Sequence, residues 1–156
     1  MSYLAISGRK IYYEEYGTDK APTLIYLHGG PGESCLTYTY QARKLGETFH
    51  VISFDQYGVF RSDAVGDESL GVNDLVQMTE QMRIALGIES WIPLGHSFGG
   101  MLALVYAHTY PESIQADENI NADVKAQWPV DTSNRFYNSQ MKYCELFKSN
   151  KLYKEK

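Results

Sequence analysis

Apolar and polar residues alternate along the first two thirds of the chain in blocks whose lengths suit strands and helices in turn. Short runs rich in β-branched and aromatic residues predict five strands, over residues 2–6, 10–16, 23–28, 50–54 and 90–94. Residues 37–46 and 73–86 read as helices, the second with apolar side chains at three- and four-residue spacing. Strands alternating with helices are typical of a parallel sheet covered by helices, here preceded by an antiparallel pair joined at Ser7-Gly8.

The ends of the helices also have signals in the sequence. Asn73 is a residue type that caps helix N-termini, and Gly87 suits the position just beyond a helix C-terminus. A further helix is predicted after Gly100, where good helix formers continue without a breaker until Tyr110-Pro111.

Beyond Ser113 the pattern changes. Residues 114–123 stand where a parallel sheet needs its next central strand, yet such strands are continuous apolar runs and this segment is mostly polar. Apolar residues over 133–149 have partly helical spacing. We therefore divide the chain into a partial core over 1–114 and a divergent, partly helical tail over 115–156. We expect the core to be cut short after the helix that ends near Tyr110.

Between the last predicted strand and the helix after it, residues 95–100 read Gly-His-Ser-Phe-Gly-Gly. This is the G-x-S-x-G pattern of a nucleophile elbow, in which a serine on a strained strand-to-helix turn is exposed for attack. Gly95 and Gly99 would remove the clashes that bulky neighbours create at such a turn. The alternative is a glycine-rich turn without chemistry, but the flanking strand and helix favour Ser97 as a nucleophile.

A second motif follows the strand over 23–28. Residues 28–32 read His-Gly-Gly-Pro-Gly. Glycines there let backbone N–H groups approach a developing oxyanion closely, because no side chain intervenes. A simple chain-reversing Gly-Pro turn is the alternative; two such motifs in order, each after a strand, favour the chemical interpretation.

With these motifs the chain resembles the α/β-hydrolase superfamily, and within it the proline iminopeptidase (prolyl aminopeptidase) group, over about residues 1–114. The likeness rests on residues 28–32, on Asp55-Gln56-Tyr57-Gly58 with Arg61-Ser62-Asp63, and on residues 95–112. The chain departs from the family at Phe60, where a small residue is usual, and at Tyr57, where arginine is frequent.

The resemblance implies a serine hydrolase that releases an N-terminal residue from peptides, with a mostly parallel central sheet flanked by helices. It implies that the backbone N–H groups of Gly30 and Phe98 form the oxyanion hole. His28 and Gly29 are candidate substrate contacts. In the family, acidic residues of a helical cap recognise the amino terminus, and none can be assigned to that role in this sequence. An amide or ester of another kind suits the same elbow.

The general base is missing from this sequence. Serine needs a base with an orienting carboxylate, and in this fold the order is Ser, then Asp or Glu, then His. Only His108 follows Ser97, and eleven helical residues place it roughly 16 Å away. His96 adjoins the nucleophile but is expected to point away from it, and His28 is expected to pack. No triad acid is assigned among the downstream carboxylates Asp117, Asp123 and Asp131.

Three interpretations therefore remain open. The chain is a serine hydrolase whose base is supplied from elsewhere or lost, a non-catalytic hydrolase-like binding module, or a truncated gene product without a function of its own.

Composition and charge limit the partners and the cellular compartment expected for this chain. A net charge of −5 without a basic run argues against nucleic-acid and membrane partners. With no signal peptide recognised, the sequence favours the cytoplasm, and with it reduced thiols at Cys35 and Cys144. The four histidines lack metal-ligand spacing, so no metal and no cofactor is expected. Small peptides, amides or esters are the expected substrates, and a sheet edge left bare after residues 91–95 predicts homodimerisation.

Overall fold

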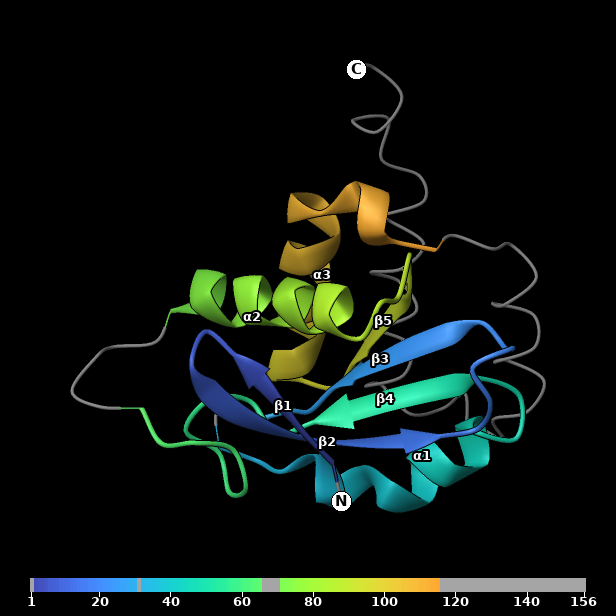
Figure 1. The fold of residues 1–156 in the computed structure, drawn as a ribbon, viewed down its shortest axis with the longest axis horizontal. Coiled ribbons are helices and arrows are strands. Elements are labelled where there is room, and N and C mark those ends of the chain that lie inside the picture. The colour runs from blue at the N-terminus through green and yellow to red at the C-terminus, as the bar shows by residue number, and fades with distance from the viewer. Residues whose placement is uncertain (1, 31, 66–70, 116–156) are drawn as a thin grey trace. The chain divides into compact units, whose positions relative to one another are not determined.

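The computed structural model describes residues 2–30, 32–65 and 71–115, which form one sheet with helices on both faces (Figure 1). The strand order is β1-β2-β4-β3-β5. The strands are β1 (Ser2–Ile6), β2 (Arg9–Tyr16), β3 (Thr23–Leu27), β4 (His50–Phe54) and β5 (Ile92–Gly95). β1 and β2 pair antiparallel, as predicted, and β2 also meets β4 antiparallel, whereas β3 pairs parallel with both β4 and β5.

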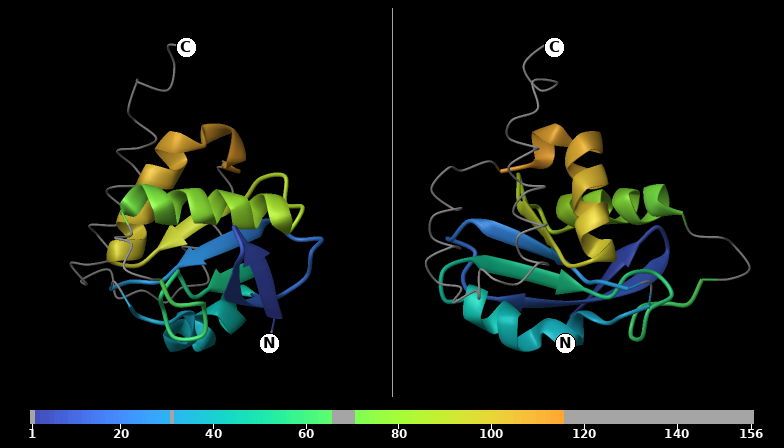
Figure 2. Two further views of the ribbon diagram at one scale, coloured as in Figure 1. Left: turned by 60° about the vertical axis from the view of Figure 1, so that its left-hand side comes forward. Right: turned by 180° about the vertical axis from the view of Figure 1, so that it is seen from behind.

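Helices cover both faces of this sheet. The short 3₁₀ helix η1 (Cys35–Tyr38) leads into α1 (Thr39–Leu45) on one face; α2 (Val72–Ala85) and α3 (Phe98–Thr109) lie on the other, followed by η2 (Pro111–Ser113) (Figure 2). Because both faces are covered, all five residues of β3 are buried, as expected for a central parallel strand. Within the described ranges, no helix has the length and apolar character that crossing a membrane requires.

The order of the connections creates a switch point in the sheet. From β3 the chain passes through α1 to β4 on one side, and then through α2 to β5 on the other side of β3. Open α/β sheets bind ligands where the strand order reverses in this way, beyond the carboxyl ends of the strands. That point lies at the ends of β3 and β5, where the two sequence motifs begin.

The ends of α2 differ in part from the prediction. Asn73 does not cap this helix: Gly71 is the N-cap residue, and its N–H donates to Asp74 Oδ2 at 2.7 Å. The prediction failed because the side chain of Asp74, the residue after Asn73, accepts a hydrogen bond from the Gly71 N–H and so fixes the start of the helix there. Gly87 does end the helix, at φ 68°, and the N–H groups of Gly87 and Ile88 donate to Ile84 O and Arg83 O in the Schellman pattern.

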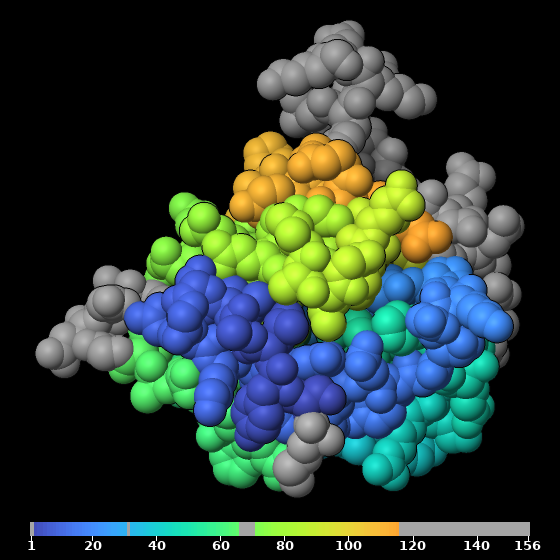
Figure 3. Space-filling view, viewed as in Figure 1, coloured from blue at the N-terminus to red at the C-terminus, as the bar shows by residue number. Residues whose placement is uncertain are grey.

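α2 also contacts the N-terminal hairpin. Ser7 Oγ donates to Gln81 Oε1 at 2.9 Å, and the space-filling view shows β1 and α2 side by side (Figure 3). This contact secures the antiparallel pair to the helical layer.

An isolated parallel bridge lies beside Trp91, at the start of the segment that the sequence marked as too polar for a strand. Trp91 and Ile114 form a parallel bridge, in which Trp91 N–H donates to Ser113 O at 3.0 Å and Gln115 N–H to Trp91 O at 2.9 Å. The segment that follows, the helix predicted over 133–149, Cys144 and the three downstream aspartates lie outside the described residues.

Candidate active site

Ser97 occupies the turn between β5 and α3. Its φ of 53° and ψ of −115° belong to a region that residues other than glycine rarely adopt, as predicted for this position. The turn is held by Gly99 N–H donating to His96 O at 2.9 Å and Gly100 N–H to Ser97 O at 2.9 Å. The Ser97 residue is exposed, so the strained turn presents it at the surface.

Gly95 and Gly99 are required by backbone contacts. A Cβ on Gly95 would lie 2.1 Å from Gly99 O, and one on Gly99 would lie 2.0 Å from Leu27 O. These distances are far inside van der Waals contact with main-chain atoms. The elbow therefore packs directly against the end of β3, which only glycine allows.

The loop after β3 lies beside this elbow. Leu27 is paired with Gly95, and His96 N–H donates to Leu27 O at 3.2 Å. The loop continues through His28 and Gly29 to Gly30, whose φ is 46°. In the part of the chain that the structure describes, the N–H groups of Gly30 and Phe98 have no hydrogen-bond acceptor. Phe98 stands in the first turn of α3, where its N–H has no acceptor within the helix.

His28 is a buried support of this loop. It is 0% exposed, its Nδ1 contacts Gly29 O at 3.0 Å, and Gln56 N–H donates to its Nε2 at 3.2 Å. The ring is therefore the Nδ1–H tautomer, and burial lowers its pKa, so it is neutral. In this arrangement both ring nitrogens are engaged inside the chain. The geometry favours packing, which leaves its predicted role in substrate binding without a contact to support it.

Asp55 organises the loop after β4. Its Oδ1 accepts from Ser34 Oγ and Cys35 N–H, both at 2.8 Å, and its Oδ2 accepts from Arg61 N–H at 3.2 Å. Asp55 of the Asp-Gln motif thus has a structural role, because its hydrogen bonds join the loops that follow β3 and β4. Cys35 beneath it is a free thiol whose pKa is raised by burial and by the Asp55 charge.

The two departures from the family have different surroundings. Tyr57 is buried, and its hydroxyl donates to Ile6 O at 3.2 Å, with Arg9 above its ring. Phe60 is 74% exposed and has a positive φ of 36°. Position 60 thus combines a backbone conformation that favours glycine with a large, exposed aromatic side chain.

Sequence reasoning missed two polar residues beside the elbow. His96 Nδ1 lies 2.7 Å from Tyr38 Oη, and Tyr38 Oη donates to Glu33 Oε2 at 3.1 Å. Tyr38 is 58 positions from His96, so no local pattern could indicate the contact.

The other two histidines, His50 and His108, lie away from Ser97. His50 begins β4, at the opposite end of the strands, where its ring nitrogens contact Thr23 and Glu15. His108 is exposed in the last turn of α3. The sequence contains no further histidine.

Comparison with known proteins agrees with this geometry. The family described as alpha/beta hydrolase fold matches residues 22–140. A proline iminopeptidase of Xylella fastidiosa (strain 9a5c) is 37% identical over 108 residues, which are 67% of this chain and 34% of that protein. One from Neisseria gonorrhoeae is 36% identical over 117 residues, 72% of this chain and 37% of that protein. The chain thus spans about a third of the length of these curated relatives.

Solved structures give the same result. A proline iminopeptidase-related protein from Thermus thermophilus matches with a TM-score of 0.66 and 31% identity, over 72% of this chain and 41% of that one. A bacterial membrane phospholipase A matches with a TM-score of 0.69 and 29% identity, over 72% of this chain and 36% of that one. These two neighbours have names that indicate different activities, so the similarity identifies the scaffold but not the substrate.

Proposed function

This chain belongs to the alpha/beta hydrolase fold family, and from that premise we propose that it carries the nucleophile segment of a serine hydrolase. Ser97 is the proposed nucleophile, and the N–H groups of Gly30 and Phe98 are the proposed oxyanion-hole donors. The observation that carries the proposal is the strained turn at Ser97, φ 53°, at the carboxyl end of β5 and beside the loop after β3.

The proposed chemistry is acyl transfer. Ser97 Oγ attacks a carbonyl carbon, and the oxygen of the tetrahedral intermediate accepts hydrogen bonds from the N–H groups of Gly30 and Phe98. One such donor contributes roughly 10²–10³-fold to turnover in a serine hydrolase. Both donors belong to backbone held by the sheet and by α3, so they need no reorganisation when charge develops.

The relatives suggest the substrate class. Their name, proline iminopeptidase, supports as substrate a peptide or amide from which an N-terminal proline or small hydrophobic residue is released. An ester or another amide would use the same elbow and donors, and it is the alternative substrate.

We further propose that none of the four histidines of the sequence is the base of this reaction. His28 and His50 have both ring nitrogens in contact with other groups, His96 contacts Tyr38, and His108 lies at the far end of α3. We therefore propose that the base lies outside these 156 residues or is lost. The same observation favours the second candidate, a non-catalytic module that keeps the site for binding.

A fluorophosphonate probe separates these two candidate functions. With Ser97 as nucleophile and no base, we expect slow labelling of Ser97 that added imidazole accelerates, and no labelling of Ser97→Ala. Turnover of a prolyl anilide should be about 10⁴-fold below that of an intact relative, because triad members act as a unit.

The outcomes are distinct. Rapid labelling without imidazole would show that a base is present after all. No labelling of the folded protein, even with imidazole, would overturn the serine-hydrolase proposal in favour of the binding module.

A further inference from the structure

Three polar side chains from separate segments meet beside the elbow. Glu33 follows the glycine loop, Tyr38 ends η1, and His96 immediately precedes Ser97. Tyr38 Oη donates to Glu33 Oε2 at 3.1 Å and lies 2.7 Å from His96 Nδ1. Its ring also packs against the buried Tyr26 of β3, with centroids 4.9 Å apart. Tyr38 is therefore positioned by the sheet and by both of its polar partners.

The donor and acceptor roles of Glu33, Tyr38 and His96 fix where the hydrogens of these contacts lie. A carboxylate can only accept, so the single hydroxyl hydrogen of Tyr38 is directed at Glu33. The 2.7 Å contact with His96 then needs a hydrogen on the ring nitrogen. The arrangement assigns the Nδ1–H tautomer to His96, with Tyr38 Oη as its acceptor.

Gly29 of the glycine loop lies between Glu33 and His96, the two ends of this series of hydrogen bonds. A Cβ there would lie 2.7 Å from His96 Nδ1 and 3.1 Å from Glu33 Oε2. Glu33 thus covers the loop from one side while the elbow residue His96 lies against it from the other. The hydrogen bonds join the two segments across this glycine.

We infer that Glu33, Tyr38 and His96 form a hydrogen-bonded strut that sets the spacing between the glycine loop and the nucleophile elbow. Gly30 lies on the first segment and Phe98 on the second, so the strut sets the separation of the two proposed oxyanion-hole donors. Its catalytic meaning rests on the proposed function, since misplacement by about 1 Å can cost roughly 10²-fold in rate. Tyr38 is on this view a positioning residue, and no part of the strut reacts with substrate.

The strut is tested by ¹⁵N nuclear magnetic resonance of the full chain at neutral pH. We expect the wild-type His96 ring to show the Nδ1–H tautomer, and Tyr38→Phe to lose it and to shift the amide resonances of Gly30 and Phe98. Tyr40→Phe is the matched control, because Tyr40 is 71% exposed on the neighbouring helix. It should change neither signal.

Two substitutions of Glu33 give a sharper test, which also holds if Tyr38→Phe does not fold. Glu33→Gln keeps an acceptor and should retain the Nδ1–H tautomer. Glu33→Ala frees the Tyr38 hydrogen to be donated to His96 Nδ1, so the ring should switch to Nε2–H. An Nε2–H ring in the wild type, or an unchanged tautomer in Tyr38→Phe or Glu33→Ala, would overturn the inference. These readouts do not involve Ser97 chemistry, so they fail independently of the labelling experiment.

Discussion

Phe60 has a backbone conformation that suits glycine. Its φ is 36° and its side chain is 74% exposed, so little burial offsets the strain. A positive φ costs a residue with a Cβ about 1–2 kcal/mol, and glycine avoids this cost. Part of the advantage is lost because glycine has greater conformational freedom in the unfolded chain. We expect Phe60→Gly to raise the free energy of unfolding by about 1 kcal/mol relative to Phe60→Ala, measured by urea denaturation.

The alanine variant is the appropriate reference, because both substitutions remove the ring and its contact with the Arg61 guanidinium. Only the glycine variant also removes the Cβ. Equal stabilities for the two would show that the loop carries no strain at this position.

Gly99 is constrained by contact rather than by its dihedral angles. A Cβ there would lie 2.0 Å from Leu27 O and 2.6 Å from His28 O, so the elbow and β3 would have to separate. We expect Gly99→Ala to lower the free energy of unfolding by about 3 kcal/mol, the upper part of the range for overpacking. Gly8→Ala is the control: no atom lies near its Cβ position, and only the φ of 78° is strained. A loss at Gly99 no larger than that at Gly8 would contradict the packing argument.

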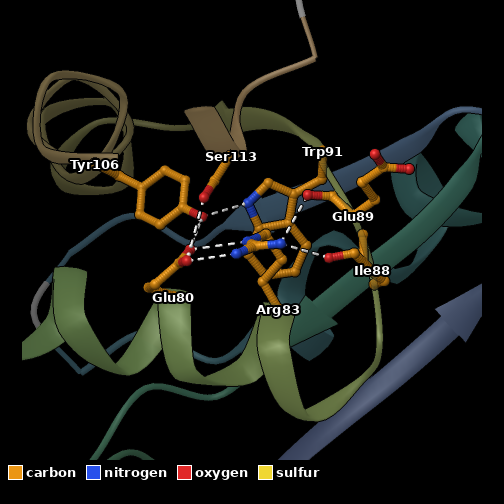
Figure 4. Close-up of polar contacts among 7 residues, drawn as sticks. All are labelled: Glu80, Arg83, Ile88, Glu89, Trp91, Tyr106 and Ser113. Atoms are coloured by element: carbon orange, nitrogen blue, oxygen red, sulfur yellow. Dashed lines mark hydrogen bonds and ion pairs between the residues drawn. The ribbon is translucent and has the colours of Figure 1, made fainter. Parts of the chain in front are cut away.

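Among the elements, α2 and α3 are joined by a buried polar network around Glu80 (Figure 4). Arg83 donates to Glu80 through Nε at 2.9 Å and Nη2 at 2.6 Å, and Tyr106 Oη of α3 donates at 2.6 Å. Ser113 Oγ donates at 3.2 Å, and Trp91 Nε1 donates to Tyr106 Oη at 2.9 Å. Glu80 thereby orients both the elbow helix and the segment at Ser113 that precedes the bridge residue Ile114.

The network predicts a pH dependence of stability. Burial alone would raise the pKa of Glu80, but hydrogen bonds from Arg83, Tyr106 and Ser113 outweigh it and the pKa is lowered. A carboxyl whose pKa falls on folding stabilises the protein above its unfolded pKa of about 4.3, and loses this contribution as pH falls through the folded value. We expect Glu80→Gln to cost about 3 kcal/mol at neutral pH, because it leaves Arg83 without its ionic partner. Below about pH 4 the difference should shrink.

Glu89→Gln is the control, since Glu89 is exposed and contributes only its backbone carbonyl to Arg83, at 2.7 Å. Chemical denaturation across that pH range measures both variants. A cost of Glu80→Gln that stays constant down to acid pH would rule out the ionised carboxylate as its source.

For the whole molecule, the outer edge of β5 is where the sequence predicted self-association. Trp91 uses its N–H and C=O on the side away from β3, for Ser113 and Gln115. Alternation along the strand directs Pro93 to the same side, where it has no N–H to donate. The homodimer predicted from the sequence would have to form on an edge that lacks this donor.

We therefore expect self-association through this edge to be weak, and Pro93→Ala to strengthen it. Sedimentation velocity over a concentration series measures the change, with Pro22→Ala as a control outside the strands. Identical association of the wild type and Pro93→Ala would exclude the edge of β5 as the dimer interface.

The sequence by itself determined the order of the elements, the strained serine turn and the two glycines that it needs. These features are local. The periodicity of strands and helices depends on neighbouring residues, and a turn between a strand and a helix restricts the residue types within a few positions. A local competitor misled the prediction at the start of α2, where Asp74 rather than Asn73 takes part in the cap.

The tertiary structure alone decided the partners of the polar side chains. His28 meets Gln56, His96 meets Tyr38, and Glu80 meets Tyr106, across 28, 58 and 26 positions of sequence. It also paired Ile114 with Trp91 in an isolated parallel bridge, at the start of a segment whose polarity argued against a strand. Such contacts depend on which strands become neighbours at the switch point and which helices cover which face, and no pattern confined to one segment carries that information.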